Sequence, residues 1–361
     1  MVKRIGILTS GGDCPGLNAV VRAVVHRAVG GLGWEVVGIR NGTLGLLQDP
    51  PDVEILTQAR FDGRLLREGG TFLGTTNKGD PFAFPMPDGT RKDRSEEITR
   101  AVRTLGLDAI IGIGGDGSQA ILKKLADQGG WDLVAIPKTI DNDLGATEVA
   151  VGYDTAVEVA VEALDRLQPT AASHHRAMVL EVMGRDAGHI ALAAGIAGGA
   201  DVIVIPEIPY RLDEVARAVR KALDAKAFAL IVVAEAVKTD TGEAVKTTLG
   251  HGAASYGGIG YWLGDRLAEA TGADVRVTVL GHVQRGGSPS PRDRLMASVF
   301  GVHAVDLIAE GRTGRMVGWW HRQVIDVPIE EAIARYQCVD VDGPLVRTAR
   351  ALGISFGDRA E

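Results

Sequence analysis

The chain has 361 residues and a formal net charge of -7 without a basic run, so a nucleic-acid partner has no electrostatic basis in it. Hydrophobic residues make up 45% and aromatic residues 5%, with 48 glycines, a composition that excludes disorder and suits parallel strands and helices joined by tight loops. This length exceeds one compact core, so we expect two lobes with the ligands bound between them.

The two cysteines, Cys14 and Cys338, lie far apart without CxxC spacing, which is typical of a reducing compartment. No histidine lies near Cys14 in sequence, so we interpret it as a buried thiol rather than a nucleophile. The N-terminal residues become glycine-rich before a signal peptide could be complete, and no apolar run reaches membrane length. We therefore expect a cytoplasmic protein without a membrane partner.

The first half of the chain predicts strands that alternate with helices. The apolar positions between Leu17 and Ala28 keep the spacing of one helix face, and a second helix is expected around residues 120–125. Residues 77–97, rich in proline, glycine and charge, predict a surface excursion. Apolar runs predict strands at residues 5–8, 34–39, 108–113 and 133–136.

The second half repeats this pattern. A helix is expected from Asp154, and another through residues 295–308 that returns the chain to the first lobe. Further strands are predicted at residues 178–182, 202–205, 230–233 and 276–280. We predict an α/β protein of two lobes, each a largely parallel sheet flanked by helices.

Three turns follow predicted strands, at residues 11–16, 114–118 and 137–143. In an open parallel sheet all three would emerge at the carboxyl edge, where ligands bind. Their glycines would let backbone N–H groups approach phosphate oxygens. The sequence has neither a P-loop motif nor a correctly placed dinucleotide fingerprint, so the turns predict a different phosphate site.

Carboxylates accompany these turns. Asp116 is well placed to hold Mg²⁺ through oxygen and water. Asp141 and Asp143 stand beside Thr139, so that one carboxylate could take a proton from an attacking hydroxyl while Thr139 and the metal organise the transferring group. The alternatives are a purely structural glycine turn and an Asx-rich turn that caps a helix.

Cations gather in the second half, at predicted strand ends. The planar fork of arginine binds two phosphate oxygens at once, whereas a lone surface arginine is usually solvated. We interpret His282 as a hydrogen-bond donor to a sugar phosphate, because no metal ligand accompanies it at the right spacing. The arginines concerned are Arg176, Arg185, Arg276 and Arg285.

With these residues in view, the sequence resembles the bacterial 6-phosphofructokinase family, and within it the branch whose members use ATP or pyrophosphate. The motifs that carry the resemblance are LTSGGDCPGLNA, GGTFLGT, IGGDGS, PKTIDND, EVMGR and TVLGHVQRGGSP, in the family's order between Leu8 and Pro289. The resemblance implies transfer of a phosphoryl group from ATP, with Mg²⁺, to the 1-hydroxyl of fructose 6-phosphate in glycolysis. It also implies a homo-oligomer, commonly a tetramer, whose active sites are shared between subunits.

The resemblance assigns roles to individual residues. The nucleotide phosphates would contact Gly12, Asn77, Lys78, Gly115, Asp116, Gly117 and Ser118, with Asp116 binding Mg²⁺. The sugar would contact Thr139, Ile140 and Asp141, with Asp141 the catalytic base. Met183, Gly184, Arg185, Glu235, His282, Val283, Gln284 and Arg285 would complete the sugar-phosphate pocket, with Arg185 also contacting the phosphoryl group. Arg176 and Arg276 resemble arginines that a neighbouring subunit contributes.

The resemblance also names the two lobes. Residues 1–152 with about 284–334 would bind the nucleotide, and about 153–283 with 335–361 the sugar phosphate.

Two positions bear on the donor. Relatives that use pyrophosphate carry aspartate where this chain has Gly117, and lysine where it has Lys138. Aspartate beside Asp116 would exclude the α-phosphate of a nucleotide by its volume and charge, whereas Lys138 excludes no donor, so we expect ATP. Asn77 and Lys78 also depart from the best-known bacterial members, which have Arg-Phe at that place.

Three other functions stay open on the sequence. The first is a pyrophosphate-dependent phosphotransferase for fructose 6-phosphate. The second is a lipid or NAD kinase, which also uses a GGDG turn but does not explain PKTIDND or the arginines. The third is a non-catalytic regulatory subunit, against which the presence of Asp116, Asp141 and Arg185 together argues.

Overall fold

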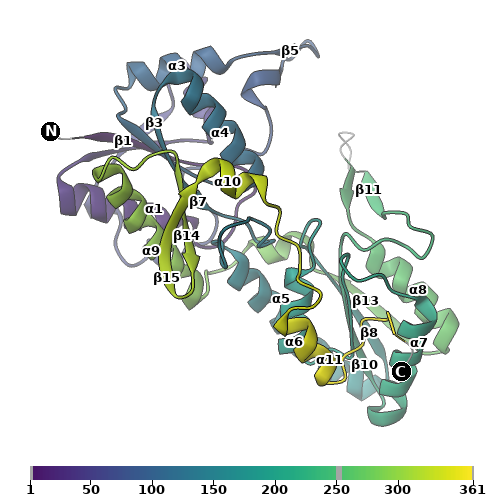
Figure 1. The fold of residues 1–361 in the computed structure, drawn as a ribbon. Helices are drawn as coiled ribbons and strands as arrows, with labels where there is room; N and C mark the ends of the chain where they lie inside the picture. Colours follow the sequence, from purple (N-terminus) through teal and green to yellow (C-terminus); the bar gives the residue numbers. More distant parts are fainter. Residues whose placement is uncertain (1–2, 249–253, 360–361) are drawn as a thin grey trace. The chain divides into compact units, whose positions relative to one another are not determined.

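The structure is a computed structural model that describes residues 3–248 and 254–359. Chain contacts divide it into two compact units. The first unit comprises Met1–Ile140, Leu144–Thr155 and Arg285–Tyr336. The second comprises Asp141–Asp143, Ala156–Gln284 and Gln337–Glu361. The predicted α/β class is confirmed, since each unit is built on a largely parallel sheet (Figure 1).

A seven-stranded sheet forms the centre of the first unit. Its strands from one edge to the other are β15 (Gln323–Pro328), β14 (Arg315–Trp320), β7 (Asp132–Pro137), β6 (Ala109–Gly114), β1 (Arg4–Thr9), β2 (Glu35–Ile39) and β3 (Val53–Leu56). The inner pairs are parallel and only the two edge strands, β15 and β3, pair antiparallel. The predicted strands at residues 5–8, 34–39, 108–113 and 133–136 correspond to β1, β2, β6 and β7.

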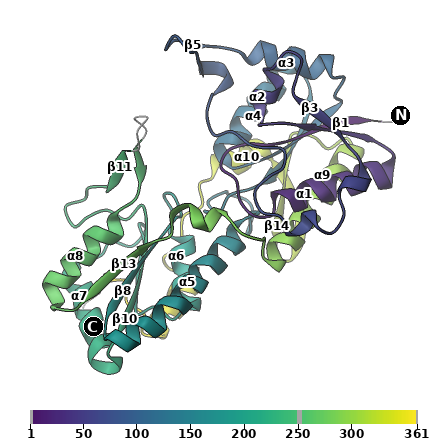
Figure 2. The same cartoon turned by 180° about the vertical axis from the view of Figure 1, so that it is seen from behind.

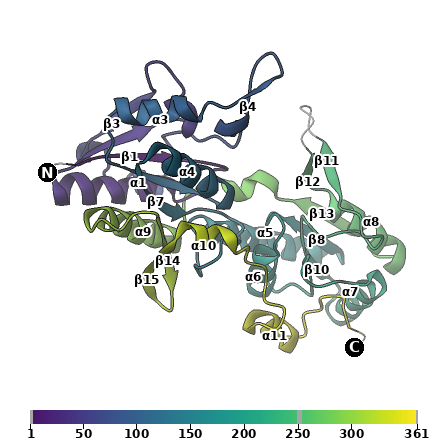
Figure 3. The ribbon, with the colours of Figure 1, turned by 45° about the horizontal axis from the view of Figure 1, so that its top comes forward.

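Helices cover both faces of this sheet (Figure 3). They are α1 (Leu17–Val25), α2 (Thr43–Leu46), α3 (Ser95–Thr104), α4 (Asp116–Gly129), α9 (Pro291–Ala309) and α10 (Ile329–Ala334). On one face α2, α3, α4 and α10 pack in sequence over a core that includes Ile98, Leu122 and Leu133. On the other face α9 packs closely on α1, because Gly301 leaves room for Ala23. A helix covered on two sides is apolar nearly all round, as α1 is.

Regular α-helix ends earlier in this region than the apolar spacing predicts. The pattern from Leu17 to Ala28 predicts one helix, but α1 ends at Val25 and residues His26–Gly31 form a π-helical turn. The excursion predicted at residues 77–97 contains the short antiparallel pair β4 (Phe84–Pro85) and β5 (Arg91–Lys92) and leads into α3. Strands β4 and β5 pair with each other and belong to neither of the two large sheets.

The second unit has a four-stranded sheet that is parallel throughout, in the order β13 (Val275–Val279), β8 (Ala177–Val182), β10 (Ala229–Ala234) and β9 (Val202–Val204). Its helices lie on both sides of the sheet (Figure 2). They are α5 (Tyr153–His174), which begins in the first unit, α6 (His189–Ala197), α7 (Leu212–Lys226), α8 (Ile259–Thr271) and α11 (Pro344–Ala351). A separate antiparallel pair is formed by β11 (Lys246–Thr248) and β12 (Ala254–Tyr256).

Strands buried on both faces explain why the sequence shows continuous apolar runs here. All six residues of β8 and all six of β10 are buried. Within residues 3–248 and 254–359, none of the helices combines the length and the hydropathy that a membrane span requires.

The burial of a strand side chain predicts how much its removal lowers the free energy of unfolding. Ile111, in the middle of β6, is fully buried, whereas Ile55, on edge strand β3, is 47% exposed. We expect Ile111→Ala to lower the free energy of unfolding by about 3 kcal/mol, because a cavity is left in the sheet core. The matched variant Ile55→Ala should cost less than about 1 kcal/mol. Urea unfolding followed by circular dichroism measures both, and equal losses would contradict this account of the core.

Candidate active site

The ends of β1, β6 and β7 lie at the same level in the first sheet. Thr9 pairs with Ile113, and Gly114 pairs with Pro137, so each strand ends beside its neighbour. Backbone bonds continue past the strands, from Ser10 N–H to the Ile113 carbonyl at 2.9 Å and from Lys138 N–H to the Gly114 carbonyl at 3.1 Å. The three turns predicted from the sequence therefore emerge side by side at the carboxyl edge.

The first turn contacts the other two at Gly11. This residue has a positive φ of 83°, which glycine adopts without strain. A Cβ there would lie 3.0 Å from Oγ of Ser118 and 3.3 Å from Nζ of Lys138, so a side chain would push the turns apart. Lys138 is buried and donates from Nζ to the carbonyl of Gly12. Lys138 thus ties the third turn to the first.

Arg285 also reaches the first turn. Its Nη1 donates to the Asp13 carbonyl at 3.1 Å, and a Cβ on Gly12 would lie only 2.9 Å from the same nitrogen. Gly12 is therefore needed for close approach of the guanidinium. Arg285, predicted to contact the sugar phosphate with His282 and Gln284, lies in the first unit, as the predicted lobe boundary near residue 284 has it, and binds the glycine turn.

The second turn opens helix α4. Asp116 stands in the first helical turn, next to the N-cap residue Gly115, where backbone N–H groups and the helix dipole favour an anion. Gly117 differs from the other glycines of the site, because a Cβ there would meet no atom within 4 Å. The fold does not require glycine at position 117, so its small size leaves open space beside Asp116.

The loop with Asn77 and Lys78 is attached to the same turn. Gly11 N–H donates to the Thr76 carbonyl at 2.8 Å, and Oγ1 of Thr75 donates to the Gly11 carbonyl at 2.7 Å. The side chains of Asn77 and Lys78 are exposed. Two bonds to Gly11 therefore place both predicted nucleotide contacts near the glycine turn.

A cavity of about 450 Å³ opens beside the first turn, within the first unit. Its lining residues are Asp13, Asn18, Glu68, Gly69, Gly70, Thr71, Phe72, Gly74 and Thr75. Asn18 fixes one part of its lining, since its amide nitrogen donates to the carbonyls of Glu68 and Gly69 and its amide oxygen accepts the N–H of Phe72. None of these residues was predicted to belong to the site, although GGTFLGT and the GLNA end of the first motif supply most of them.

The third turn is divided between the units. Thr139 and Ile140 are buried in the first unit, and Asp141 is buried in the second. Asp143, also in the second unit, lies with its Oδ2 atom 3.7 Å from Nη1 of Arg185. The structure thus brings Asp143 of the PKTIDND motif close to Arg185.

A second group of predicted residues lies at the carboxyl edge of the second sheet. Val182 pairs with Ala234, so Met183 and Glu235 leave β8 and β10 side by side. Oε1 of Glu235 accepts the N–H groups of Gly184 at 3.3 Å and Arg185 at 3.0 Å. Oε1 of the buried Gln284 accepts the N–H of Met183 at 2.7 Å. Glu235 and Gln284 therefore fix the backbone that carries Arg185.

His282 and Val283 follow β13 in the same unit. They belong to a short 3₁₀ turn over residues Gly281–Arg285, and both are exposed. The turn is attached to β8 through the N–H of Leu280, which donates to the Glu181 carbonyl at 3.1 Å. His282 is therefore presented on the carboxyl side of the sheet, as Met183 and Glu235 are.

Arg176 and Arg276 lie at the opposite edge of this sheet. Arg176 precedes β8, and Arg276 is the second residue of β13. Both bind Asp274, Arg176 from Nε at 2.6 Å and Arg276 through Nη1. The six residues of β8 span roughly 20 Å. These two arginines are therefore not gathered with Arg185, although the sequence placed all of them at strand ends.

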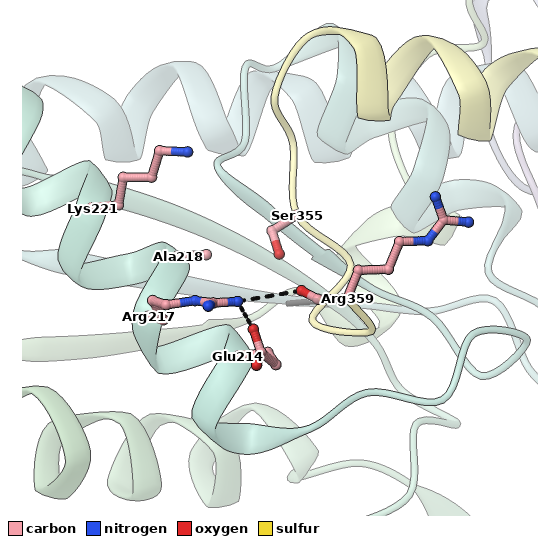
Figure 4. A pocket seen from close by; sticks show the side chains of 6 residues that line it. All are labelled: Glu214, Arg217, Ala218, Lys221, Ser355 and Arg359. Carbon is pink, nitrogen blue, oxygen red and sulfur yellow. Dashed lines mark hydrogen bonds and ion pairs between the residues drawn. The ribbon is translucent and has the colours of Figure 1, made fainter. Parts of the chain in front are cut away.

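A cavity of about 200 Å³ in the second unit lies away from all predicted site residues. Its lining residues are Glu214, Arg217, Ala218, Lys221, Ser355 and Arg359. Figure 4 shows that Arg217 points to Glu214 and to the carbonyl of Arg359, whereas the Lys221 and Arg359 side chains point away from Arg217. Its cations do not converge, and we assign no site there.

Comparison with known proteins identifies the family. The profile described as phosphofructokinase matches residues 4–308. The chain belongs to the phosphofructokinase family. It is 63% identical over 99% of both chains to an ATP-dependent 6-phosphofructokinase 1 of Synechocystis sp., and 62% identical, again over 99% of both, to one of Nostoc sp.. A solved phosphofructokinase of Pichia pastoris in the T-state is 31% identical, with a TM-score of 0.80, over 92% of this chain and 36% of that chain.

Glu235 is a carboxylate of the site whose pKa is strongly raised. Burial raises its pKa from 4.5 to about 7, the charge of Asp141 adds to this rise, and the N–H groups of Arg185 and Gly184 oppose it. Between about pH 4.5 and 7 the folded state therefore retains a proton that the unfolded chain has lost. Stability that depends on this proton is present at low pH and falls as the pH rises through 7.

Glu235→Gln should remove this dependence. Because the neutral amide does not titrate, we expect the free energy of unfolding of the unmodified protein to fall, from pH 5 to pH 8, by about 2 kcal/mol more than that of the variant. Urea unfolding at a series of pH values measures the difference. Glu162→Gln, at an exposed position of α5, is the control and should follow the unmodified protein. Parallel curves for Glu235→Gln and the unmodified protein would contradict the raised pKa.

Proposed function

We propose that the chain is an ATP-dependent 6-phosphofructokinase, a phosphotransferase that forms fructose 1,6-bisphosphate in glycolysis. The observation that carries this is 63% identity along 99% of both chains to a relative of that name. The alignment of three phosphate-type turns at one sheet edge supports it independently. The first unit then binds the nucleotide, the second the sugar phosphate, and the enzyme works in the cytoplasm.

The first unit supplies groups suited to the donor. Backbone N–H groups around Gly12 and at the start of α4, with Asn77 and Lys78, would hold the nucleotide phosphates. Asp116 would hold Mg²⁺, which proteins often bind through one carboxylate and the phosphates of the substrate. The residues fit such an ion because Asp116 stands in the first turn of α4, beside backbone N–H groups that suit the phosphates. When bound, Mg²⁺ neutralises charge on the phosphates.

Groups suited to the acceptor come mainly from the second unit, and Thr139, Ile140 and Arg285 of the first unit add to them. The carboxylate of Asp141 would take the proton of the 1-hydroxyl, while Thr139 and Ile140 contact the sugar. Arg185, held by Glu235 through its backbone, would bind the phosphoryl group in transfer, because its fork matches two oxygens. Met183, Gly184, His282, Val283, Gln284 and Arg285 would contact the sugar phosphate.

Asp141→Asn tests the base. The amide keeps the volume of the carboxylate but cannot accept the proton, so we expect kcat to fall by about a thousandfold. Binding of fructose 6-phosphate, measured by calorimetry, should change little, because the base acts in the transition state. A fall in kcat smaller than about tenfold would remove Asp141 from this role.

Gly117 tests the choice of donor. Gly117→Asp should lower kcat/KM for ATP by about a hundredfold, because a carboxylate beside Asp116 repels the nucleotide phosphates. Gly117→Ala is the matched control and should change kcat/KM less than about fivefold, since a methyl group meets no atom within 4 Å. Assays run in parallel with ATP and with pyrophosphate. Turnover of the unmodified enzyme with pyrophosphate but not ATP would establish the alternative donor, which Lys138 favours.

We also infer that Arg176 and Arg276 serve the active site of a neighbouring subunit in a homo-oligomer, commonly a tetramer. This proposal is supported by the position of both arginines where β8 and β13 begin, whereas Met183 follows the end of β8. The length of β8, roughly 20 Å, therefore separates them from Met183. Each arginine would bind the sugar phosphate of the neighbouring subunit, because the sugar phosphate of its own subunit lies at the other end of the strands.

Mixing two inactive variants tests this sharing. Asp141→Asn should be nearly inactive alone, and Arg276→Ala should have little activity when fructose 6-phosphate is kept well below the raised KM of this variant. Unfolded together and refolded, they should recover about a quarter of the unmodified activity, because half of the symmetric pairs are mixed and each mixed pair has one intact site. Arg266→Ala, an exposed arginine of α8, is the control in place of Arg276→Ala and should itself be active. No recovery in the mixture would show that Arg276 acts within its own subunit.

A further inference from the structure

A buried carboxylate joins the starts of two helices in the first unit. Asp293 of α9 has no exposed surface. Its Oδ1 accepts the N–H of Gly152 at 2.9 Å, and its Oδ2 accepts the N–H and the hydroxyl of Thr155 at 2.8 and 2.5 Å. The Oγ1 atom of Thr155 in turn accepts the N–H of Ser290 at 3.0 Å. Asp293 and Thr155 therefore link the first turn of α9 to the first turn of α5.

Capping of α9 does not require this carboxylate. Ser290 is the N-cap residue, and its hydroxyl accepts the N–H of Asp293 at 3.1 Å. Burial raises the pKa of Asp293, and its bonds to Thr155 and Gly152 oppose the rise. A fully buried carboxylate is costly unless its oxygens are bonded, and here all three of its donors belong to Gly152 and Thr155. What the carboxylate adds is a fixed position for the backbone at residues 152–155.

That backbone lies directly behind two turns of the site. The Cys14 thiol donates to the Val151 carbonyl at 3.3 Å, and a Cβ on Gly152 would lie 2.5 Å from Sγ of Cys14. On its other side, Val151 N–H donates to the Pro137 carbonyl at 3.1 Å and pairs with Lys138. The same Cβ on Gly152 would lie 3.5 Å from Cγ2 of Ile140. Residues 151–152 thus fill the space between the first and third turns.

We propose that Asp293 is a positioning residue for phosphoryl transfer, which it serves through Gly152 and Thr155. By holding residues 151–152 against Cys14 and Ile140, it keeps the Gly11–Gly16 turn and Lys138–Ile140 in register with each other. Displacement of about 1 Å in such groups is enough to slow a reaction strongly, because reacting atoms must stay aligned. The proposal rests on the proposed function for its activity measurement, and on Cys14 for a measurement that needs no activity.

Cys14 reports the position of the turn directly. Burial raises the pKa of its thiol to about 12, so the folded protein should react slowly with a thiol reagent. The other cysteine, Cys338, is exposed and can be replaced by serine. In a Cys338→Ser background, the rate of thiol modification then measures how often the Gly11–Gly16 turn opens.

The experiment compares variants that keep or remove the link. Thr155→Val and Asp293→Asn remove bonds of the carboxylate, whereas Thr155→Ser keeps the hydroxyl. Asp306→Asn is the control on the same helix, where Asp306 binds Arg27 at 2.6 Å and faces no turn of the site. For each folded variant, circular dichroism, the thiol rate, kcat, and KM for ATP and for fructose 6-phosphate are measured.

We expect Thr155→Val and Asp293→Asn to raise the thiol rate and to lower kcat by about tenfold or more, with KM for fructose 6-phosphate nearly unchanged. Thr155→Ser and Asp306→Asn should stay within about twofold of the unmodified protein. If Asp293→Asn does not fold, the pair Thr155→Val and Thr155→Ser decides alone.

A change in only one of the two measurements, or in neither, would overturn the proposal. If the unmodified protein does not phosphorylate fructose 6-phosphate, the proposed function is wrong. The thiol rates then still decide whether Asp293 holds the turn.

Discussion

The parallel register of β1, β6 and β7 is the constraint on which the rest of the first unit depends. Because Thr9 stands beside Ile113 and Gly114 beside Pro137, three loops that are far apart in sequence must leave the sheet at one place. Parallel strands require crossover connections, and these put helices on both faces and bury the strands completely. The same burial leaves the carboxyl edge as the place where polar backbone and charged side chains can meet a ligand. A slip of register by one residue would separate Gly11 from Ser118 and Lys138 and turn the strand side chains to the wrong face.

Charged side chains bound to backbone groups support the carboxyl ends of both sheets, each within its own unit. Lys138 ties its turn to Gly12, Glu235 binds the backbone of Arg185, and Asp293 binds Gly152 and Thr155. Each is a charged side chain whose partners are largely backbone groups that would otherwise be unsatisfied at a strand or helix end. Chemistry on phosphates depends on positioning and on fixed charge, so rigid support of this kind is where a kinase gains its rate. The raised pKa of Glu235 shows the cost, because burial disfavours the charge that binds the backbone.

Glycines in the site serve different physical purposes, and only the structure separates them. Gly11 has a positive φ, and the absence of a side chain at Gly12 lets the Arg285 guanidinium approach the turn, so the fold itself needs both glycines. Gly117 is surrounded by open space, and the fold has no use for its missing side chain. A glycine that packing does not require, next to a carboxylate at the start of a helix, is explained by what must approach it from outside. A side chain at position 117 would therefore meet ligand or solvent rather than the atoms of the fold.

The sequence by itself determined the α/β class, the approximate strands and the motifs around Gly11, Asp116 and Asp141, because local periodicity and glycine punctuation are properties of neighbouring residues. It could not decide which strand ends share an edge. Arg176, Arg185 and Arg276 all read as strand-end arginines, yet Arg185 follows β8 while Arg176 and Arg276 lie where β8 and β13 begin. The sequence motif placed Arg285 beside His282, but it could not show that Arg285 also binds the glycine turn of the first unit. The sequence also did not predict the π-helical turn after Val25 or the link from Asp293 to Gly152 and Thr155. Such features depend on contacts between residues more than a hundred positions apart or on packing around a helix, and only the tertiary structure decides them.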